Sequence, residues 1–92
     1  MTDIARSLFL AASRYDAAQD KRDAKHGLAP NVYRFGLILE RLDRAQQARA
    51  AGASLARSLY DNFNDRLLTA LERAAGVAVT CGGGARDTGR PL

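Results

Sequence analysis

The stretch Ser54–Gly76, SLARSLYDNFNDRLLTALERAAG, decides the fold, because its apolar side chains recur with the period of an α-helix. At about 100° per residue they share one arc, which holds Leu55, Leu59, Phe63, Leu67, Leu71 and Ala74. The opposite arc is polar and holds Ser58, Asp61, Asn62, Asp65, Arg66, Thr69, Glu72 and Arg73. With Ser54 as N-cap and Gly76 as the C-terminal stop, the pattern predicts an amphipathic helix over residues 54–75.

Phe63 is the largest side chain on the apolar arc, so we expect it in the core, where Phe63→Ala would cost about 3–5 kcal/mol. The segment DNFND, residues 61–65, is a weak point of this helix, because Asn and Asp side chains compete with the backbone for hydrogen bonds. A kink near residues 61–64, or a split into two shorter helices, is therefore an alternative.

Two further helices are expected before this one. Thr2 is a suitable N-cap for a helix over residues 3–25, which Gly27 and Pro30 end. Its apolar stripe is Ile4, Leu8, Ala11, Tyr15 and Ala18.

Asn31 is a suitable N-cap for a helix over residues 31–49. Its main stripe is Phe35, Ile38, Leu39, Leu42 and Ala45. The linker that follows, residues 49–54, is short and contains Gly52. We therefore expect this helix to lie antiparallel beside the helix over 54–75 and to cover its apolar arc.

The predicted fold is all-α: a small three-helix bundle over residues 1–76, followed by a disordered tail over residues 77–92. The tail reads VAVTCGGGARDTGRPL, a composition too poor in large apolar residues to form a core. A glycine-rich phosphate-binding loop is not expected there, because no helix follows it in the sequence.

Self-association is expected from the size of the core. The chain has 92 residues, of which 7% are aromatic, and a core of this size supplies only about 3–5 kcal/mol. Four apolar side chains lie off the main stripes and are candidates for a homodimer interface: Phe9, Leu10, Tyr33 and Leu37. The leading hypothesis is a non-catalytic protein–protein interaction module.

The net charge of +4 makes an anionic partner the second hypothesis. An accessory nucleic-acid-binding protein would use the basic residues of the helix over 31–49, namely Arg34, Arg41, Arg44 and Arg49. A helix-turn-helix around Gly52 is less favoured, because Asp61, Asp65 and Glu72 on the following helix would repel phosphate.

No catalytic, cofactor-binding or metal-binding set is recognised, and we expect a protein that is not an enzyme. His26 is the only histidine and Cys81 the only cysteine, so a metal site lacks partners and a disulfide within the chain is excluded. The sequence has no transmembrane span or signal-peptide pattern, which predicts a cytoplasmic protein without membrane partners.

From Asn31 to Gly76 the chain resembles a loose group of small uncharacterised helical proteins carried by bacterial plasmids and integrated mobile elements. The similar positions are NVY at 31–33, the pattern LxLxRLD at 37–43, Gly52, FNDRLL at 63–68 and RAAG at 73–76. The resemblance implies an accessory protein of a mobile element. It implies no functional residues, because no activity is assigned to the group.

Overall fold

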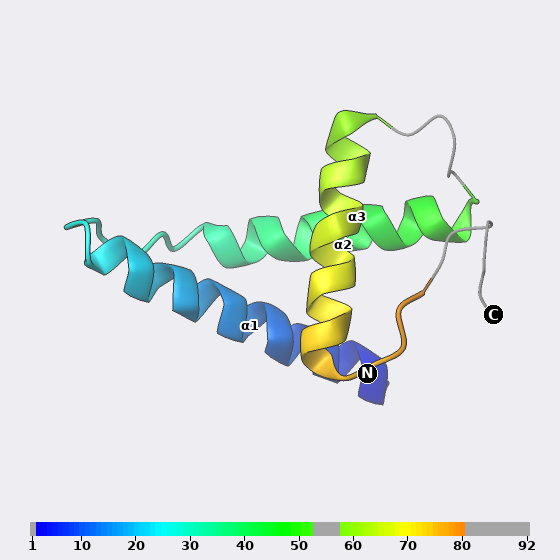
Figure 1. The fold of residues 1–92 in the computed structure, drawn as a ribbon, viewed down its shortest axis with the longest axis horizontal. Helices are drawn as coiled ribbons and strands as arrows, with labels where there is room; N and C mark the ends of the chain where they lie inside the picture. The colour runs from blue at the N-terminus through cyan, green and yellow to red at the C-terminus, as the bar shows by residue number, and fades with distance from the viewer. Residues whose placement is uncertain (1, 53–57, 81–92) are drawn as a thin grey trace.

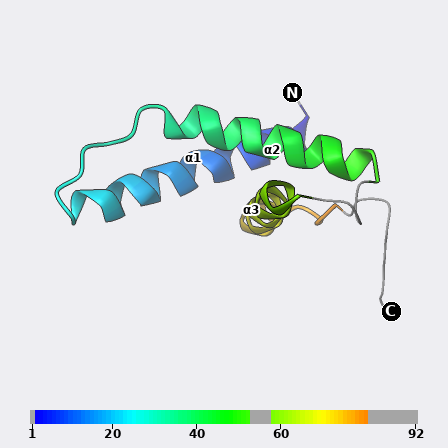
Figure 2. The same ribbon diagram turned by 90° about the horizontal axis from the view of Figure 1, so that it is seen from above.

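The computed structural model describes residues 2–52 and 58–80, which form three α-helices and no strands. These are α1 (Asp3–Ala24), α2 (Arg34–Ala50) and α3 (Leu59–Ala75). Helices α1 and α2 form an antiparallel hairpin, and α3 crosses both of them (Figure 1) on one face of that hairpin (Figure 2).

The predicted all-α three-helix fold is confirmed. The antiparallel placement of α3 beside α2 is wrong, because the connection spans residues 51–58 and leaves α3 room to turn.

The ends of α1 follow the local sequence signals. The Oγ1 of Thr2 accepts a 3.0 Å hydrogen bond from the amide of Ala5, which confirms Thr2 as the N-cap. After the helix, Gly27 adopts a φ of 75°, a left-handed conformation that side chains other than glycine rarely adopt. The hairpin turn therefore begins where the sequence predicted the first helix would end.

The start of α2 differs from the prediction. The helix begins at Arg34 instead of residue 31, and Tyr33 occupies the N-cap position without a side-chain hydrogen bond. The Oδ1 of Asn31 accepts a 3.0 Å hydrogen bond from the amide of Tyr33. Asn31 therefore stabilises a local turn before the helix, which is the other common use of an Asn side chain near a helix start.

Helix α3 begins later than predicted and is continuous. Ser58 is its N-cap, and the Oγ of Ser58 accepts a 3.0 Å hydrogen bond from the amide of Asp61. The predicted cap, Ser54, lies outside the described residues. Gly76 ends the helix with a φ of 73°, as expected. The alternative of a break near 61–64 does not apply, since one helix runs from Leu59 to Ala75.

The core lies where α3 crosses the first half of α1 and the middle of α2. Its fully buried apolar residues are Leu8, Ala11, Ala12, Ile38, Leu42, Ala45, Leu67, Leu68 and Leu71. Phe35, Leu39, Ala75 and Val77 pack against this cluster. The α2 stripe therefore covers α3 as expected, although through Ile38, Leu42 and Ala45 more than through Phe35.

The side of α3 that enters the core is only partly the predicted one, since Leu67 and Leu71 of the predicted arc are buried. Phe63 is 56% exposed and Leu59 86% exposed, whereas Asn64 and Leu68 are completely buried. Since Asn64 is one residue on from Phe63, the helix is turned by about 100° about its axis relative to the prediction. The prediction that Phe63 lies in the core is therefore wrong. Asn64 and Glu72 enter the interior instead, where Arg41 and Arg49 of α2 are their polar partners.

Residues 77–80, assigned to the tail from the sequence, lie against α3. The amide and the Oγ1 of Thr80 both donate to the Oε2 of Glu72, at 3.2 and 2.8 Å. Val77 packs against the core. The rest of the predicted tail, residues 81–92, lies outside the described residues. Among the helices described, none is long and apolar enough to cross a membrane.

Candidate functional site

A groove lies in the corner between α3 and the hairpin, with a volume of about 520 Å³. It is lined by residues from all three helices: Tyr15 of α1, Arg41 of α2, and Phe63, Arg66, Leu67 and Ala70 of α3. The three α3 residues Phe63, Leu67 and Ala70 belong to the apolar side of the helix identified in the sequence. Because α3 is turned, much of this apolar side borders the groove instead of the core.

Arg41 is held in a defined position on the wall of this groove. Its guanidinium carbon lies 4.1 Å from the centre of the Phe63 ring, a cation–π contact. Its Nε donates a 2.8 Å hydrogen bond to the Oδ1 of Asn64, and its Nη2 donates to the carbonyl oxygen of Phe63 at 3.5 Å. The Nη1 makes no hydrogen bond within the described residues, so this edge is available to a ligand.

Asn64 is an unusual residue to find in a core. It is completely buried, and its Nδ2 has no hydrogen-bond partner among the described residues. A buried amide N–H without a partner costs about 1–3 kcal/mol. The one hydrogen bond that its side chain makes serves to orient Arg41.

A second pairing of an arginine with an aromatic ring lies nearby on the same two helices. The guanidinium carbon of Arg44 lies 5.1 Å from the centre of the Tyr60 ring. Arg41 and Arg44, two of the four arginines proposed from the sequence for nucleic acid, therefore both contact exposed rings of α3. Arg66, on the other wall of the groove, forms no ion pair with described residues and is exposed.

Arg34, the first of those four arginines, binds three carboxylates of α1. Its ion pairs with Asp16, Asp20 and Asp23 measure 3.2, 2.8 and 2.6 Å. The spacings of four and three residues place the three carboxylates on one face of α1. The hydrogen bond to Asp20, followed by those to Asp16 and Asp23, raises the pKa of Arg34 against the opposing effect of burial. This cluster carries more negative than positive charge and closes the hairpin.

Arg49, the last of the four, is buried and connects α2 to α3. It donates to Asp65 Oδ1 at 2.6 Å, to Glu72 Oε1 at 2.7 Å, and to the hydroxyls of Thr69 and Thr80 at 2.6 and 2.7 Å. Burial alone lowers the pKa of Arg49, but the hydrogen bonds that it donates to Asp65 and Glu72 outweigh burial and the net pKa is raised. The structure therefore does not bring the four arginines together into one basic row.

Two of the four apolar residues proposed for a dimer interface, Phe9 and Leu10, lie on α1, and the other two, Tyr33 and Leu37, lie at the start of α2. The ring of Phe9 packs edge-on against Phe35, with centroids 5.1 Å apart, at the seam of the hairpin. Leu37 follows Phe35 by two residues and so lies about 200° further around α2. Leu10, Tyr33 and Leu37 are all exposed.

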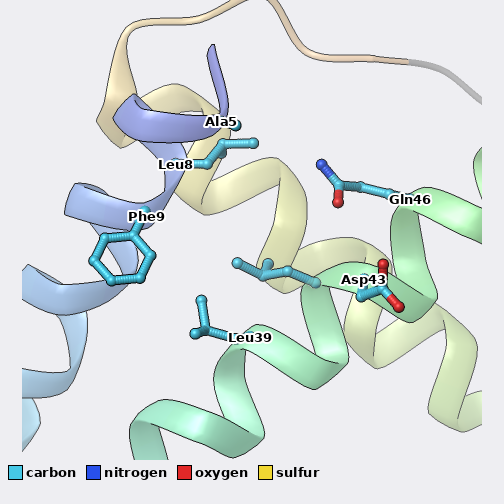
Figure 3. A pocket seen from close by; sticks show the side chains of 7 residues that line it. Ala5, Leu8, Phe9, Leu39, Asp43 and Gln46 are labelled. Atoms are coloured by element: carbon cyan, nitrogen blue, oxygen red, sulfur yellow. The ribbon is translucent and has the colours of Figure 1, made fainter. Parts of the chain in front are cut away.

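A smaller cavity of about 150 Å³ lies at the hairpin seam beside Phe9. Leu8 and Phe9 of α1 face Leu39, Asp43 and Gln46 of α2 across it (Figure 3). Its walls are mostly apolar, and it is a shallow packing gap between two helices.

Chemistry at the remaining candidates is limited. His26 is exposed in the hairpin turn, and Cys81 lies outside the described residues. Within residues 2–52 and 58–80, no group of three or more His, Cys, Asp or Glu is arranged to hold a metal ion.

The chain matches no protein-family model, no curated protein and no solved structure. Its function must therefore be inferred from the chemistry of the described residues. Sequence reasoning missed Tyr15, Arg66, Leu67 and Ala70 as groove residues.

Proposed function

We propose that the protein is a non-catalytic protein–protein interaction module that binds its partner along the uncovered side of α3. The observation that supports this most directly is the exposure of Phe63, in a groove whose floor is apolar. A helix that leaves large apolar side chains beside a groove is typical of surfaces that receive another helix. The resemblance of residues 31–76 would make the module an accessory protein of a mobile element.

The partner in this proposal is either a second copy of the chain, giving the homodimer expected from the sequence, or a different protein. Both would cover the same side of α3. Nucleic acid is less well supported as a partner, because Arg34 and Arg49 already bind carboxylates of the same chain.

Phe63→Ser tests this proposal, with Leu10→Ser as the matched control, because both side chains are exposed and large. The mass of the full chain is measured by light scattering at micromolar concentration, and proteins retained from the producing cell are compared between the two variants. We expect a partner, either a second copy or another protein, that is lost with Phe63→Ser and kept with Leu10→Ser. A monomeric mass together with an identical set of retained proteins for both variants would contradict the proposal.

A further inference from the structure

From the groove beside α3 we infer that the partner presents an acidic amphipathic helix, whose carboxylates bind Arg41 and Arg66 and whose apolar ridge covers Phe63 and Ala70. This inference rests on the proposed function and names the chemistry of its partner.

The shape of the groove suits a helix. The part of α3 that lines the groove runs from Phe63 to Ala70, about 10 Å at 1.5 Å per residue, and it forms one wall. The closed end of the hairpin extends past its crossing with α3 (Figure 1), and Tyr15 and Arg41 line the groove from the hairpin side. A partner helix laid alongside α3 would contact all three helices and bury apolar side chains of two of them.

The charge of the groove selects an acidic partner. Its lining residues include two arginines and no carboxylate. Arg66 forms no ion pair with described residues, and the Nη1 edge of Arg41 is unoccupied by any described group. A guanidinium binds a carboxylate through two parallel hydrogen bonds, so two arginines flanking an apolar floor match acidic residues flanking an apolar ridge.

The placement of Asn64 indicates that the groove is a built site. The chain keeps a completely buried amide whose Nδ2 has no partner among the described residues. What this amide provides is the 2.8 Å hydrogen bond that holds Arg41. A guanidinium already fixed by Asn64 and by the Phe63 ring loses little further freedom on binding, which strengthens its contact with a carboxylate.

A second copy of this chain would be a poor occupant. The side of α3 that it would bring to the groove carries Arg66 and no carboxylate among the groove residues. Of the three carboxylates of α3, Asp65 and Glu72 bind Arg49 against α2, and Asp61 is not among the groove residues. Pairing two copies through this groove would therefore gather four arginines without acidic partners among the groove residues.

Nucleic acid also fits less well than an acidic helix. A phosphate backbone is bound by a continuous track of positive charge. In this protein the positive charge is not continuous along α2. Three carboxylates surround Arg34 on one side of Arg41, and two bind Arg49 on the other. The remaining basic surface at the groove is short and has an apolar floor.

The test is fluorescence anisotropy with the full chain and two labelled synthetic peptides of equal length. Both form an amphipathic helix with the same apolar ridge, and one has glutamates flanking the ridge where the other has lysines. We expect the glutamate peptide to bind at least about tenfold more tightly, with an affinity that falls as salt is added. Arg41→Gln and Arg66→Gln should each weaken it about tenfold, whereas Arg6→Gln, a control of equal charge on the exposed side of α1, should leave it unchanged.

Equal binding of the two peptides would overturn the inference, as would an affinity insensitive to both groove substitutions. A single-stranded and a duplex oligonucleotide form a third arm: if they bind more tightly than the glutamate peptide and depend on Arg41 and Arg66, the partner is nucleic acid and the inference is wrong. Arg66 is exposed, so Arg66→Gln stays informative even if Arg41→Gln unfolds the chain. Failure of the glutamate peptide with Phe63-dependent partner binding intact would reject this inference and keep the proposed function.

Discussion

Arg49 of α2 and Glu72 of α3 form a 2.7 Å ion pair whose side chains are only 6% and 3% exposed. Asp65, Thr69 and Thr80 provide the remaining partners of the guanidinium. A buried ion pair adds little stability over an apolar pair of the same volume, but it is costly to break, since one charge is left without a partner. This pair therefore fixes which side of α3 faces α2.

Arg49→Ala is expected to destabilise the protein by about 3–5 kcal/mol, because it leaves the buried carboxylate of Glu72 unpaired. Arg44→Ala, which removes an exposed arginine from the same helix, should cost less than about 1 kcal/mol. Urea unfolding followed by circular dichroism measures both. Similar midpoints for the two variants would show that Arg49 is not the residue that connects the helices.

Phe63→Ala is expected to leave stability within about 1 kcal/mol of the unmodified chain, since the ring is exposed. Leu68→Ala, at a completely buried position of the same helix, should cost about 2–5 kcal/mol. Thermal melts of the two variants make the comparison. A larger loss for Phe63→Ala than for Leu68→Ala would mean that α3 is turned the other way, as the sequence pattern suggested.

Asn64→Leu is expected to raise the free energy of unfolding by about 1 kcal/mol, because it removes an unpartnered buried amide and adds apolar contact. It should also weaken binding of the glutamate-flanked peptide, since Arg41 loses its 2.8 Å hydrogen bond. Urea unfolding measures the change in stability, and fluorescence anisotropy measures the change in peptide affinity of the same variant. A stabilised variant with unchanged peptide affinity would show that Asn64 does not position Arg41 for binding.

The pH dependence of stability tests the cluster around Arg34. The hydrogen bond from Gln19, reinforced by Arg34, holds the pKa of Asp23 below its ordinary value of 3.8. A carboxyl whose pKa is lowered by folding stabilises the folded state above its unfolded pKa, and this contribution is lost as pH falls through the lower folded value. Asp23→Asn should therefore melt at a lower temperature than the unmodified chain at pH 7, and the difference should shrink below about pH 3.8. A difference that stays constant down to pH 2 would argue against this ion pair.

Local signals in the sequence identified the three helices and several of their ends. Thr2 and Gly76 act on backbone groups a few residues away, so their roles can be recognised without knowing the fold. The orientation of α3 could not be predicted in this way. Glu72 was assigned to the solvent-facing side because it is polar, and Asn64 was considered only as part of the weak point at residues 61–65. Only the arrival of Arg41 and Arg49 from α2 makes their burial possible.

The candidate site was predicted only in part. Arg41 was named among the basic residues, although for a different partner and in a row that the structure does not form. Phe63 was assigned to the interior because an apolar stripe gives no information on which part of its width is covered. Tyr15 and Ala70 enter the groove only through the crossing of α3 over the hairpin, which depends on the connection at residues 51–58.

The position of the core has a consequence for how the molecule opens. The fully buried apolar cluster contains no residue between Ala12 and Ile38, so the far half of the hairpin is held by α1–α2 contacts and by the ion pairs of Arg34. Backbone amides in that half should exchange with deuterium through local fluctuations, well before those beneath α3, which require global unfolding. Since Tyr15 lies at the border between the two regions, a partner in the groove would slow exchange in the hairpin as well as in α3.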